Sequence, residues 1–285
     1  MMLRRLIHWP TLVVVVVLGG HTPPVQAQVN QDAFERLRAL NAVFKDPARA
    51  DLDVVRRALK SALADPDDGV RAAAVDLIGS FRGRQLYGFG NPSAAVWQRF
   101  VPLAAEFRPA ILAALTDPSA RVRGNAVSAL VVTDVEIIPG AGGPPQVRIP
   151  PALAERLQQL ASDDASVRSR IVNFFGRSTV SHDPATLAIA RSVLLRGLED
   201  TDPYVVQFAG SAMYEWRIPE ALPLLVKQLG HTSQIARMGV AQGLQGYGAT
   251  ARPYLPQIEE AVKREPDGPT KKTLEAAVTR IRENR

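Results

Sequence analysis

Apolar residues return at helical spacing in several segments of the chain that are similar to one another. The segment "VRAAAVDLIGSF" begins at Val70 and "VRGNAVSALVVT" at Val122; others begin at Val167, Val205 and Ile235. If the first residue of each is position 0, small or apolar residues return at positions 4, 5 and 8. These positions form one stripe on a helix of 3.6 residues per turn, so each segment predicts a helix with one buried face.

A second amphipathic pattern precedes each of these helices. We expect the preceding helices at 52–63, 108–116, 152–161, 187–198 and 221–229, a final pair at 251–264 and 270–283, and an opening helix at 31–44. Because helix pairs that repeat along a chain stack on their neighbours, the pattern predicts an all-α fold, a right-handed α–α solenoid of about six helix pairs over residues 28–285.

Two insertions lengthen the repeats. The first residues of successive second helices lie 52, 45, 38 and 30 residues apart. The extra residues of the longer repeats fall at 82–99 and 133–151. The second insertion is too rich in glycine and proline for a helix. Its flanks "VEII" and "QVRI" predict a short hairpin across the glycines.

An acid and a base recur at the turn inside each pair. The chain reads "DPDDGVR" at 65–71, "DPSARVR" at 117–123 and "DDASVR" at 163–168. Proline after aspartate favours a turn, where the carboxylate can accept backbone N–H groups, and the arginine can reach the aspartate of an adjacent repeat. We expect a structural ladder made of Asp65, Arg71, Asp117, Arg123, Asp163 and Arg168. Catalysis by these groups is the alternative, but catalytic groups are rarely duplicated in every repeat.

These motifs, with the alanines and leucines that follow them, resemble the HEAT-repeat family, including its short variant in phycobiliprotein-lyase-like proteins. The resemblance covers most of residues 50–284 and implies the ladder role given above. It weakens at 200–206, where Val206 replaces the arginine, and at 230–236, where only apolar positions survive. The family shares a scaffold and no common chemistry. Because some HEAT-like folds resemble lyases or DNA-repair glycosylases, a lyase-type enzyme and a nucleic-acid-binding repeat protein stay as alternatives.

The first 27 residues have the parts of an export signal. Arg4 and Arg5 precede the apolar run 11–20, and "VQA" at 25–27 offers small residues ahead of Gln28. The run is shorter than the roughly 20 residues that cross a bilayer, so we expect cleavage rather than stable membrane insertion. We therefore expect a signal peptide at 1–27 and a periplasmic or secreted protein, with a retained membrane anchor as the alternative.

Charge and composition narrow the candidate chemistry. The formal net charge is +6, and it falls to +4 when the signal peptide is removed with Arg4 and Arg5. A net charge of +4 does not indicate nucleic-acid binding unless the basic residues gather on one face. The chain has no cysteine, no HExxH motif and no phosphate-binding loop, and the histidines beyond residue 27, His182 and His231, fall in different repeats. We expect no catalytic site, no metal and no cofactor.

A partner is expected along the concave face that the second helices line in a solenoid. Candidate contact residues at positions 3, 6 and 10 are Asn125, Ser128, Arg170, Asn173, Arg177 and Phe208. The arginines make this face locally basic and suit it to a protein or peptide, including an acidic one. In the first insertion, Tyr87, Phe89 and Trp97 are either exposed anchors or side chains that close a gap between repeats.

Overall fold

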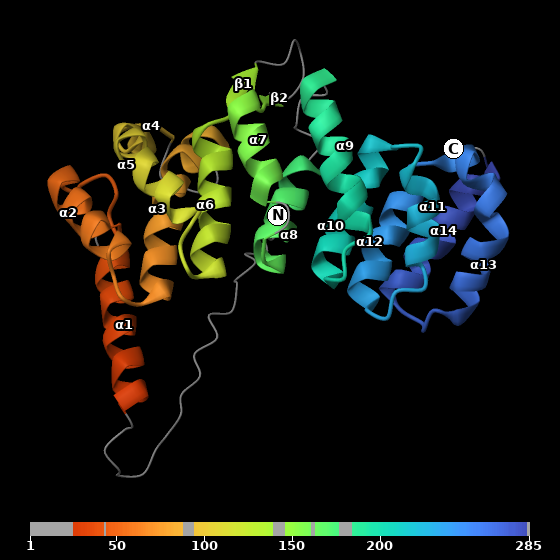
Figure 1. Cartoon of the computed structure of the whole chain (residues 1–285), viewed down its shortest axis with the longest axis horizontal. Coiled ribbons are helices and arrows are strands. Elements are labelled where there is room, and N and C mark those ends of the chain that lie inside the picture. Colours follow the sequence, from red (N-terminus) through yellow and green to blue (C-terminus); the bar gives the residue numbers. More distant parts are fainter. Residues whose placement is uncertain are drawn as a thin grey trace, which may run out of the picture.

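Helices stack in pairs along one long axis (Figure 1). The computed structural model describes residues 25–42, 44–87, 94–138, 146–160, 163–176 and 184–283. The predicted signal peptide therefore lies outside the described residues, except for Val25–Ala27, which are part of the opening helix α1 (Val25–Ala42).

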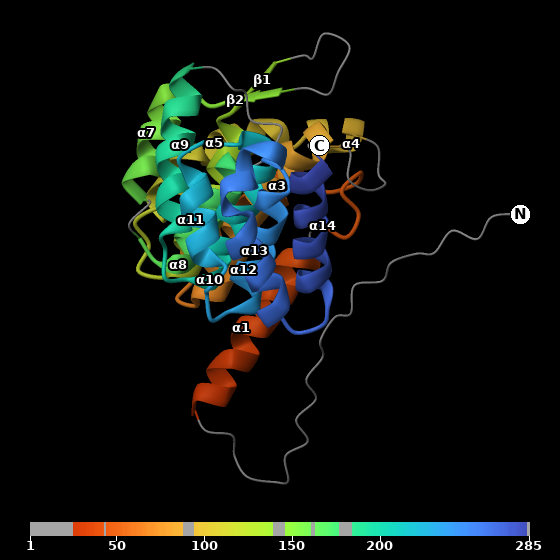
Figure 2. The same cartoon turned by 90° about the vertical axis from the view of Figure 1, so that its right-hand side faces the viewer.

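The pairs form two layers (Figure 2). The first helices are α2 (Leu52–Leu63), α5 (Val101–Ala114), α7 (Pro151–Gln159), α9 (Pro184–Leu198), α11 (Ala221–Gln228) and α13 (Leu255–Arg264). The second helices are α3 (Asp68–Tyr87), α6 (Ala120–Thr133), α8 (Ala165–Phe175), α10 (Pro203–Trp216), α12 (Gln234–Leu244) and α14 (Pro269–Glu283). Each second helix packs on the second helix of the next pair. The predicted solenoid of helix pairs is confirmed.

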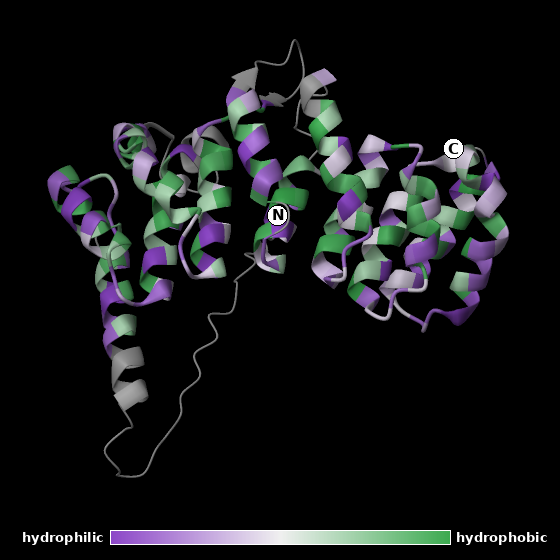
Figure 3. Cartoon of the chain, in the orientation of Figure 1, coloured by the Kyte–Doolittle hydropathy of each residue, from purple (hydrophilic) through white to green (hydrophobic). Residues whose placement is uncertain are grey.

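The buried stripe follows the predicted spacing. In α6, Val122 is 1% exposed, and Ala126, Val127 and Leu130 are fully buried. These are positions 0, 4, 5 and 8, so the apolar period places one face of the helix in the core. Both hydrophobic and hydrophilic residues colour each helix in Figure 3, as expected where helices bury one face and expose another.

Several predicted boundaries were wrong. The opening helix spans Val25–Ala42 rather than 31–44, and α13 begins at Leu255 rather than 251. The first insertion does not begin as a loop at Arg82, because α3 continues to Tyr87, and a short helix α4 (Ala94–Gln98) follows. Arg82 donates hydrogen bonds to the Thr133 and Val135 carbonyls at the end of α6, which fixes the extra helical turn against the next repeat. Helix α5 begins at Val101 rather than 108, with a proline at its first turn and Pro109 inside it.

The predicted hairpin in the second insertion is confirmed. Strand β1 (Glu136–Ile138) pairs antiparallel with β2 (Gln146–Arg148), and Ile137 lies opposite Val147. Near the other end of the chain, a 3-10 segment (Gly248–Tyr254) precedes α13. The hairpin follows α6 and precedes α7, so the insertion lies between the second and third helix pairs.

Candidate functional site

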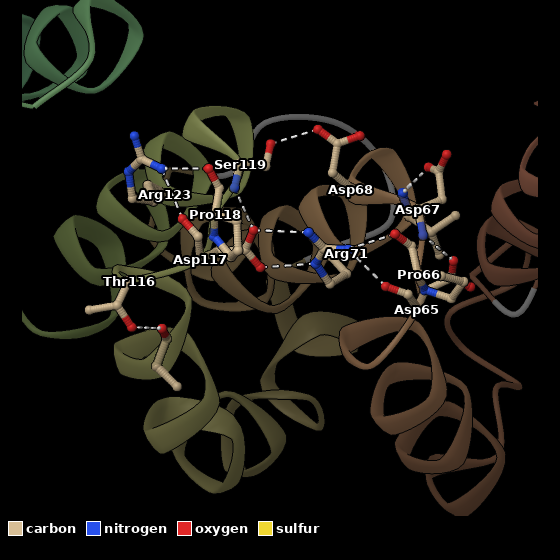
Figure 4. A network of polar contacts seen from close by, with 12 residues as sticks. Asp65, Pro66, Asp67, Asp68, Arg71, Thr116, Asp117, Pro118, Ser119 and Arg123 are labelled. Atoms are coloured by element: carbon tan, nitrogen blue, oxygen red, sulfur yellow. Dashed lines mark hydrogen bonds and ion pairs between the residues drawn. The ribbon is translucent and has the colours of Figure 1, made fainter.

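The arginine of the repeated motif joins two turns (Figure 4). Arg71 Nε and Nη2 each lie 2.9 Å from a carboxylate oxygen of Asp117, in the next repeat. Its Nη1 donates to the carbonyls of Asp65 and Pro66, at 2.9 and 3.0 Å, in its own turn. One guanidinium therefore holds two consecutive repeats in register through planar, bidentate pairing.

The same contact recurs along the stack. Arg123 pairs with Asp163 at 2.9 and 2.7 Å, and Arg168 pairs with Asp200 at 2.7 Å through both nitrogens. Each arginine also donates to the carbonyl of the aspartate in its own turn. Two further pairs that the motif search did not find extend the series, Arg36 with Asp65 from α1 and Arg237 with Glu265 near α14. We call these five pairs the ladder.

The ladder is interrupted once among the described residues, between α10 and α12. Val206 occupies the arginine position, as the sequence indicated, and His231 occupies the position of the aspartate. The imidazole takes over one function of the carboxylate, because His231 Nδ1 accepts the Ser233 N–H at 2.9 Å. The Asp117 carboxylate accepts the Ser119 N–H in the same way, at 2.8 Å.

The predicted alignment of the fifth repeat was wrong by one residue. Ile235, taken as its first buried residue, is 38% exposed, whereas Ala236 is fully buried. Arg237 then stands at the motif arginine position and donates to the His231 and Thr232 carbonyls, as Arg71 does in its turn. The apolar character of Ile235 hid this arginine, so the prediction that only apolar positions survive there was wrong.

Two ladder carboxylates, Asp117 and Asp163, are held ionised by their arginines. A side-chain hydrogen bond from Arg71 holds the pKa of the Asp117 carboxyl below its usual value. A hydrogen bond from Arg123 does the same for the pKa of Asp163. Carboxylates with lowered pKa values and bidentate partners stabilise a turn but are poorly placed to donate a proton near neutral pH.

The face of the second helices brings together part of the predicted binding set. Arg170 of α8 extends over Gly124 of α6 and donates from Nη1 to Ser128 Oγ at 2.9 Å. A Cβ at position 124 would lie 2.8 Å from Arg170 Nε, so the glycine allows the arginine to lie across α6. Asn125 Nδ2 donates to the Ala72 carbonyl of α3 at 2.8 Å. We call Asn125, Ser128 and Arg170 the central polar face.

Arg170 differs electrostatically from the ladder arginines. Its side chain is partly buried, and no carboxylate of the described residues lies within ion-pair distance. Burial lowers the pKa of its guanidinium, and the charge of Asp76 on α3 opposes that shift. A partly desolvated guanidinium without a carboxylate partner among the described residues favours an anionic ligand.

Other predicted residues have different places. Asn173 and Phe208 are half-buried on α8 and α10, and beyond them Ser211 donates to Gln242 Oε1 of α12 at 2.6 Å. Arg177 lies outside the described residues. The structure therefore brings Ser128 and Arg170 together, as their spacing predicted, and places Asn125 on the same helix as Ser128. Several of these polar groups already bond to neighbouring helices.

The aromatic residues of the first insertion do not form exposed anchors where they can be placed. Trp97 of α4 is 5% exposed, and its ring lies 5.5 Å from that of Phe100. Phe100 in turn contacts Phe81 and Phe44, so Trp97 closes a gap beneath the helices. The interpretation of Trp97 as an exposed anchor was wrong. Phe89 and the side chain of Tyr87 lie outside the described residues.

Within the described ranges, no group of three or more His, Cys, Asp or Glu side chains could hold a metal ion. His231 is engaged in its turn, and His182 falls outside these ranges. No helix in the described part of the chain has the length and apolar character to cross a membrane.

A groove that the sequence did not predict separates α5 from α7. One part, of about 340 Å³, is lined by Arg82, Ala104, Arg108, Pro150 and Leu153 among others. An adjoining part of about 300 Å³ continues along Leu112, Glu155, Arg156 and Gln159. Its walls belong to helices far apart in sequence, which explains why residue spacing gave no signal for it.

Sequence comparisons agree with the repeat architecture. Residues 107–132 match the model of the HEAT repeat, and residues 43–78 match a HEAT repeat associated with sister chromatid cohesion. No curated protein matches the chain significantly.

Similar solved structures include engineered proteins and designed armadillo repeat proteins. An engineered protein superposes with a TM-score of 0.50 at 17% identity, covering 80% of this chain and 98% of its own. A designed armadillo repeat protein gives 0.47 at 18% identity, covering 79% and 99%. Another, solved in complex with a Lys-Arg repeat peptide, gives 0.47 at 16% identity, covering 79% and 98%. The helix pairs and the motif ladder form a repeat solenoid, and two of its segments match HEAT-repeat models.

Proposed function

We propose that the protein is a non-catalytic scaffold that binds a protein or peptide along the second helices. The observation that carries the proposal is Arg170, a partly buried guanidinium held in place by Ser128 and Gly124 with no carboxylate partner among the described residues. Asp76 acts on Arg170 only from beyond ion-pair distance. A carboxylate of the partner would supply a directly bonded counter-charge, because guanidinium groups bind carboxylates through paired N–H donors.

The neighbouring residues favour a polypeptide over a small molecule. Half-buried polar and aromatic side chains continue from α6 to α12, through Asn173, Phe208 and Ser211. Polar groups on successive helices suit an extended chain, which offers a backbone N–H or C=O at each residue. The partner that fits is a peptide segment with at least one acidic side chain placed at Arg170.

Nucleic acid is a poorer fit. Many arginines of the chain are neutralised in the ladder, and other exposed ones pair with nearby acids, such as Arg56 with Glu106. A nucleic-acid surface needs unpaired cations gathered on one face. Among the described residues, the cation of the central polar face is Arg170, which is not a group of cations.

Peptide selection tests the proposal. A displayed library of random linear peptides would be selected on the full chain, on Arg170→Ala, and on Arg148→Ala as a matched control from the hairpin. We expect Asp and Glu to be enriched on the wild type and on Arg148→Ala, and that enrichment to disappear on Arg170→Ala. Equal enrichment on all three proteins would show that the central polar face does not select carboxylates.

We also propose that the protein is exported and works in the periplasm or outside the cell. The support is the sequence of residues 1–27, with Arg4 and Arg5 ahead of an apolar run and small residues before Gln28. Mass spectrometry of the protein recovered from cell fractions tests it. A cytoplasmic protein that still carries Met1 would contradict it.

A further inference from the structure

A second arginine of the second-helix layer is held without a carboxylate, on α14. Arg280 Nη1 donates to Tyr214 Oη of α10 at 3.1 Å, and its Cζ lies over the Tyr214 ring, 5.6 Å from the ring centroid. Both residues are half-buried, and no carboxylate of the described residues lies within ion-pair distance of Arg280. The nearby Arg282 is paired with Glu259 at 2.6 Å. Arg280 therefore resembles Arg170 rather than the paired arginines.

The contact between Arg280 and Tyr214 crosses the end of α12. Helices α10, α12 and α14 follow one another in the stack (Figure 1). Helix α12 ends at Leu244, and Gly246, two residues later, has no side chain. A Cβ at Gly246 would lie 2.5 Å from the Tyr214 carbonyl oxygen, so a larger residue would push this turn away from α10. The missing side chain allows α10 and α14 to meet across α12.

The pair of Arg280 and Tyr214 has the donors that a carboxylate needs. Tyr214 Oη accepts the arginine N–H, and within the described ranges its own O–H has no acceptor. Stacking on the ring holds the guanidinium in one orientation. A carboxylate can accept the phenol O–H with one oxygen and a guanidinium N–H with the other.

Arg280 lies on the same face of its helix as Arg170 does. Thr270 is fully buried, five residues after the ladder acid Glu265, which is the distance between the acid and position 0 in the complete motifs. Thr270 is therefore position 0 of α14, and Arg280 is position 10, whereas Arg170 is position 3 of α8. Positions seven apart lie two helical turns apart on one face.

The two guanidinium groups lie over helices that are two steps apart. Arg170 bonds Ser128 of α6, and Arg280 bonds Tyr214 of α10. Helix α8 packs on both α6 and α10. Packed helices lie about 8–10 Å apart, so two steps measure about 16–20 Å. An extended peptide rises about 3.3 Å per residue, so about five or six residues cover this distance.

We propose that Arg280 and Tyr214 bind a second acidic residue of the peptide that Arg170 binds, about five or six residues from the first. The inference rests on the function proposed for Arg170, because it adds a second contact with the same partner. The second carboxylate accepts an N–H of Arg280 and the O–H of Tyr214. Two acids at a fixed spacing set the register of the peptide on the helices, which a single acid cannot do.

The spacing of acids in selected peptides is the direct measurement. A displayed library of random linear peptides would be selected on the full chain, on Arg280→Gln and on Arg170→Ala, with Arg282→Ala as the control from the same helix. On the wild type and on Arg282→Ala we expect pairs of Asp or Glu about five or six residues apart. On Arg280→Gln one acid should remain and the preferred spacing should disappear. Circular dichroism checks that each variant is folded.

The affinity of one selected peptide measures the second contact. Replacing its second acid by the corresponding amide should weaken binding to the wild type about tenfold and leave binding to Arg280→Gln unchanged. Tyr214→Phe keeps the ring beneath the guanidinium and removes the O–H, so it should weaken binding by a smaller factor, about threefold. A merely structural role of Arg280 would not make its effect depend on the second acid.

The outcomes separate this inference from the proposed function. Acid enrichment that needs Arg170 but has no preferred spacing would overturn the second contact and leave the proposed function in place. A preferred spacing that is unchanged on Arg280→Gln would do the same. Acid enrichment that is indifferent to Arg170 would contradict the proposed function, and the inference would fail with it.

Discussion

Single arginines make the polar contacts that join neighbouring repeats. Each ladder arginine bonds the carbonyls of its own turn and the carboxylate of the next, as Arg71 does with Asp65 and Asp117. The side chains of Arg123 and Asp163 are 18% and 20% exposed, so their pairing is less screened than that of surface ion pairs. We infer that the ladder contributes to stability and has no catalytic role.

Arg123→Ala should lower the melting temperature. This substitution removes the hydrogen-bond donor of the Asp163 carboxylate and of the Asp117 carbonyl. The free energy of unfolding should therefore fall by about 2 kcal/mol. The melting temperature should fall by about 5 °C in thermal unfolding followed by circular dichroism. Arg38→Ala, which removes an exposed pair with Glu35, is the control and should change it by less than about 1 °C. Equal shifts would argue against the ladder.

Stability should fall in acid because of the ladder carboxyls. The pKa of Asp117 and of Asp163 is lowered from 3.8, with hydrogen bonds from Arg71 and Arg123 as the first cause. A pKa that is lower in the folded than in the unfolded chain gives stability that is complete above the unfolded pKa and is lost as the pH falls through the folded one. Urea unfolding at about pH 7 and about pH 3 should show this loss. Asp117→Asn should lose less over the same interval.

The ladder could be predicted where the motif is complete. Asp65, Arg71, Asp117 and Arg123 stand at fixed distances from a turn-forming proline, so their contacts follow from the repeat. Arg237 was missed because the neighbouring Ile235 looks like a buried residue, although it lies on the surface. The role of Arg170 needed the structure, because only the fold shows that Gly124 gives it a path across α6.

Pairs of helices differ in how closely they pack. Where the ladder is interrupted, α10 and α12 meet through glycines: a Cβ at Gly243 would lie 2.1 Å from the Gly210 carbonyl oxygen. A Cβ at Gly239 would lie 2.2 Å from the Gln207 carbonyl oxygen. Close backbone contact therefore joins α10 and α12 at the repeat boundary that lacks a ladder pair.

Gly243→Ala should destabilise the protein, although alanine is the better helix former. The added methyl would push α12 away from α10, and we expect a loss of at least about 2 kcal/mol from overpacking. Gly230→Ala is the control, since its nearest contact would be 3.5 Å away. Chemical unfolding of both variants measures the difference. A neutral Gly243→Ala would show that the two helices can separate freely.

Helix periodicity predicted which segments are helical more reliably than where they end. The stripe of buried positions in α6 follows the apolar spacing. The extension of α3 to Tyr87 was not predicted, because the repeat spacing assigned residues 82–99 to an insertion. That extension includes Arg82, which contacts carbonyls at the end of α6, a contact between repeats that local sequence does not encode.

The whole molecule presents two surfaces that differ in origin. The central polar face arises from equivalent positions of consecutive second helices, so residue spacing could indicate it. The groove between α5 and α7 arises from the separation of two first helices near the hairpin, and no repeated residue marks it.

The most direct measurement is a double-mutant cycle between Arg170 and an acidic residue of a selected linear peptide, with dissociation constants from fluorescence polarisation. Arg170→Glu should weaken the acidic peptide at least about tenfold, and replacing the peptide's acid by lysine should restore much of that loss. This recovery would show that the guanidinium and the carboxylate interact. Independent, additive effects of the two changes would contradict binding at the central polar face.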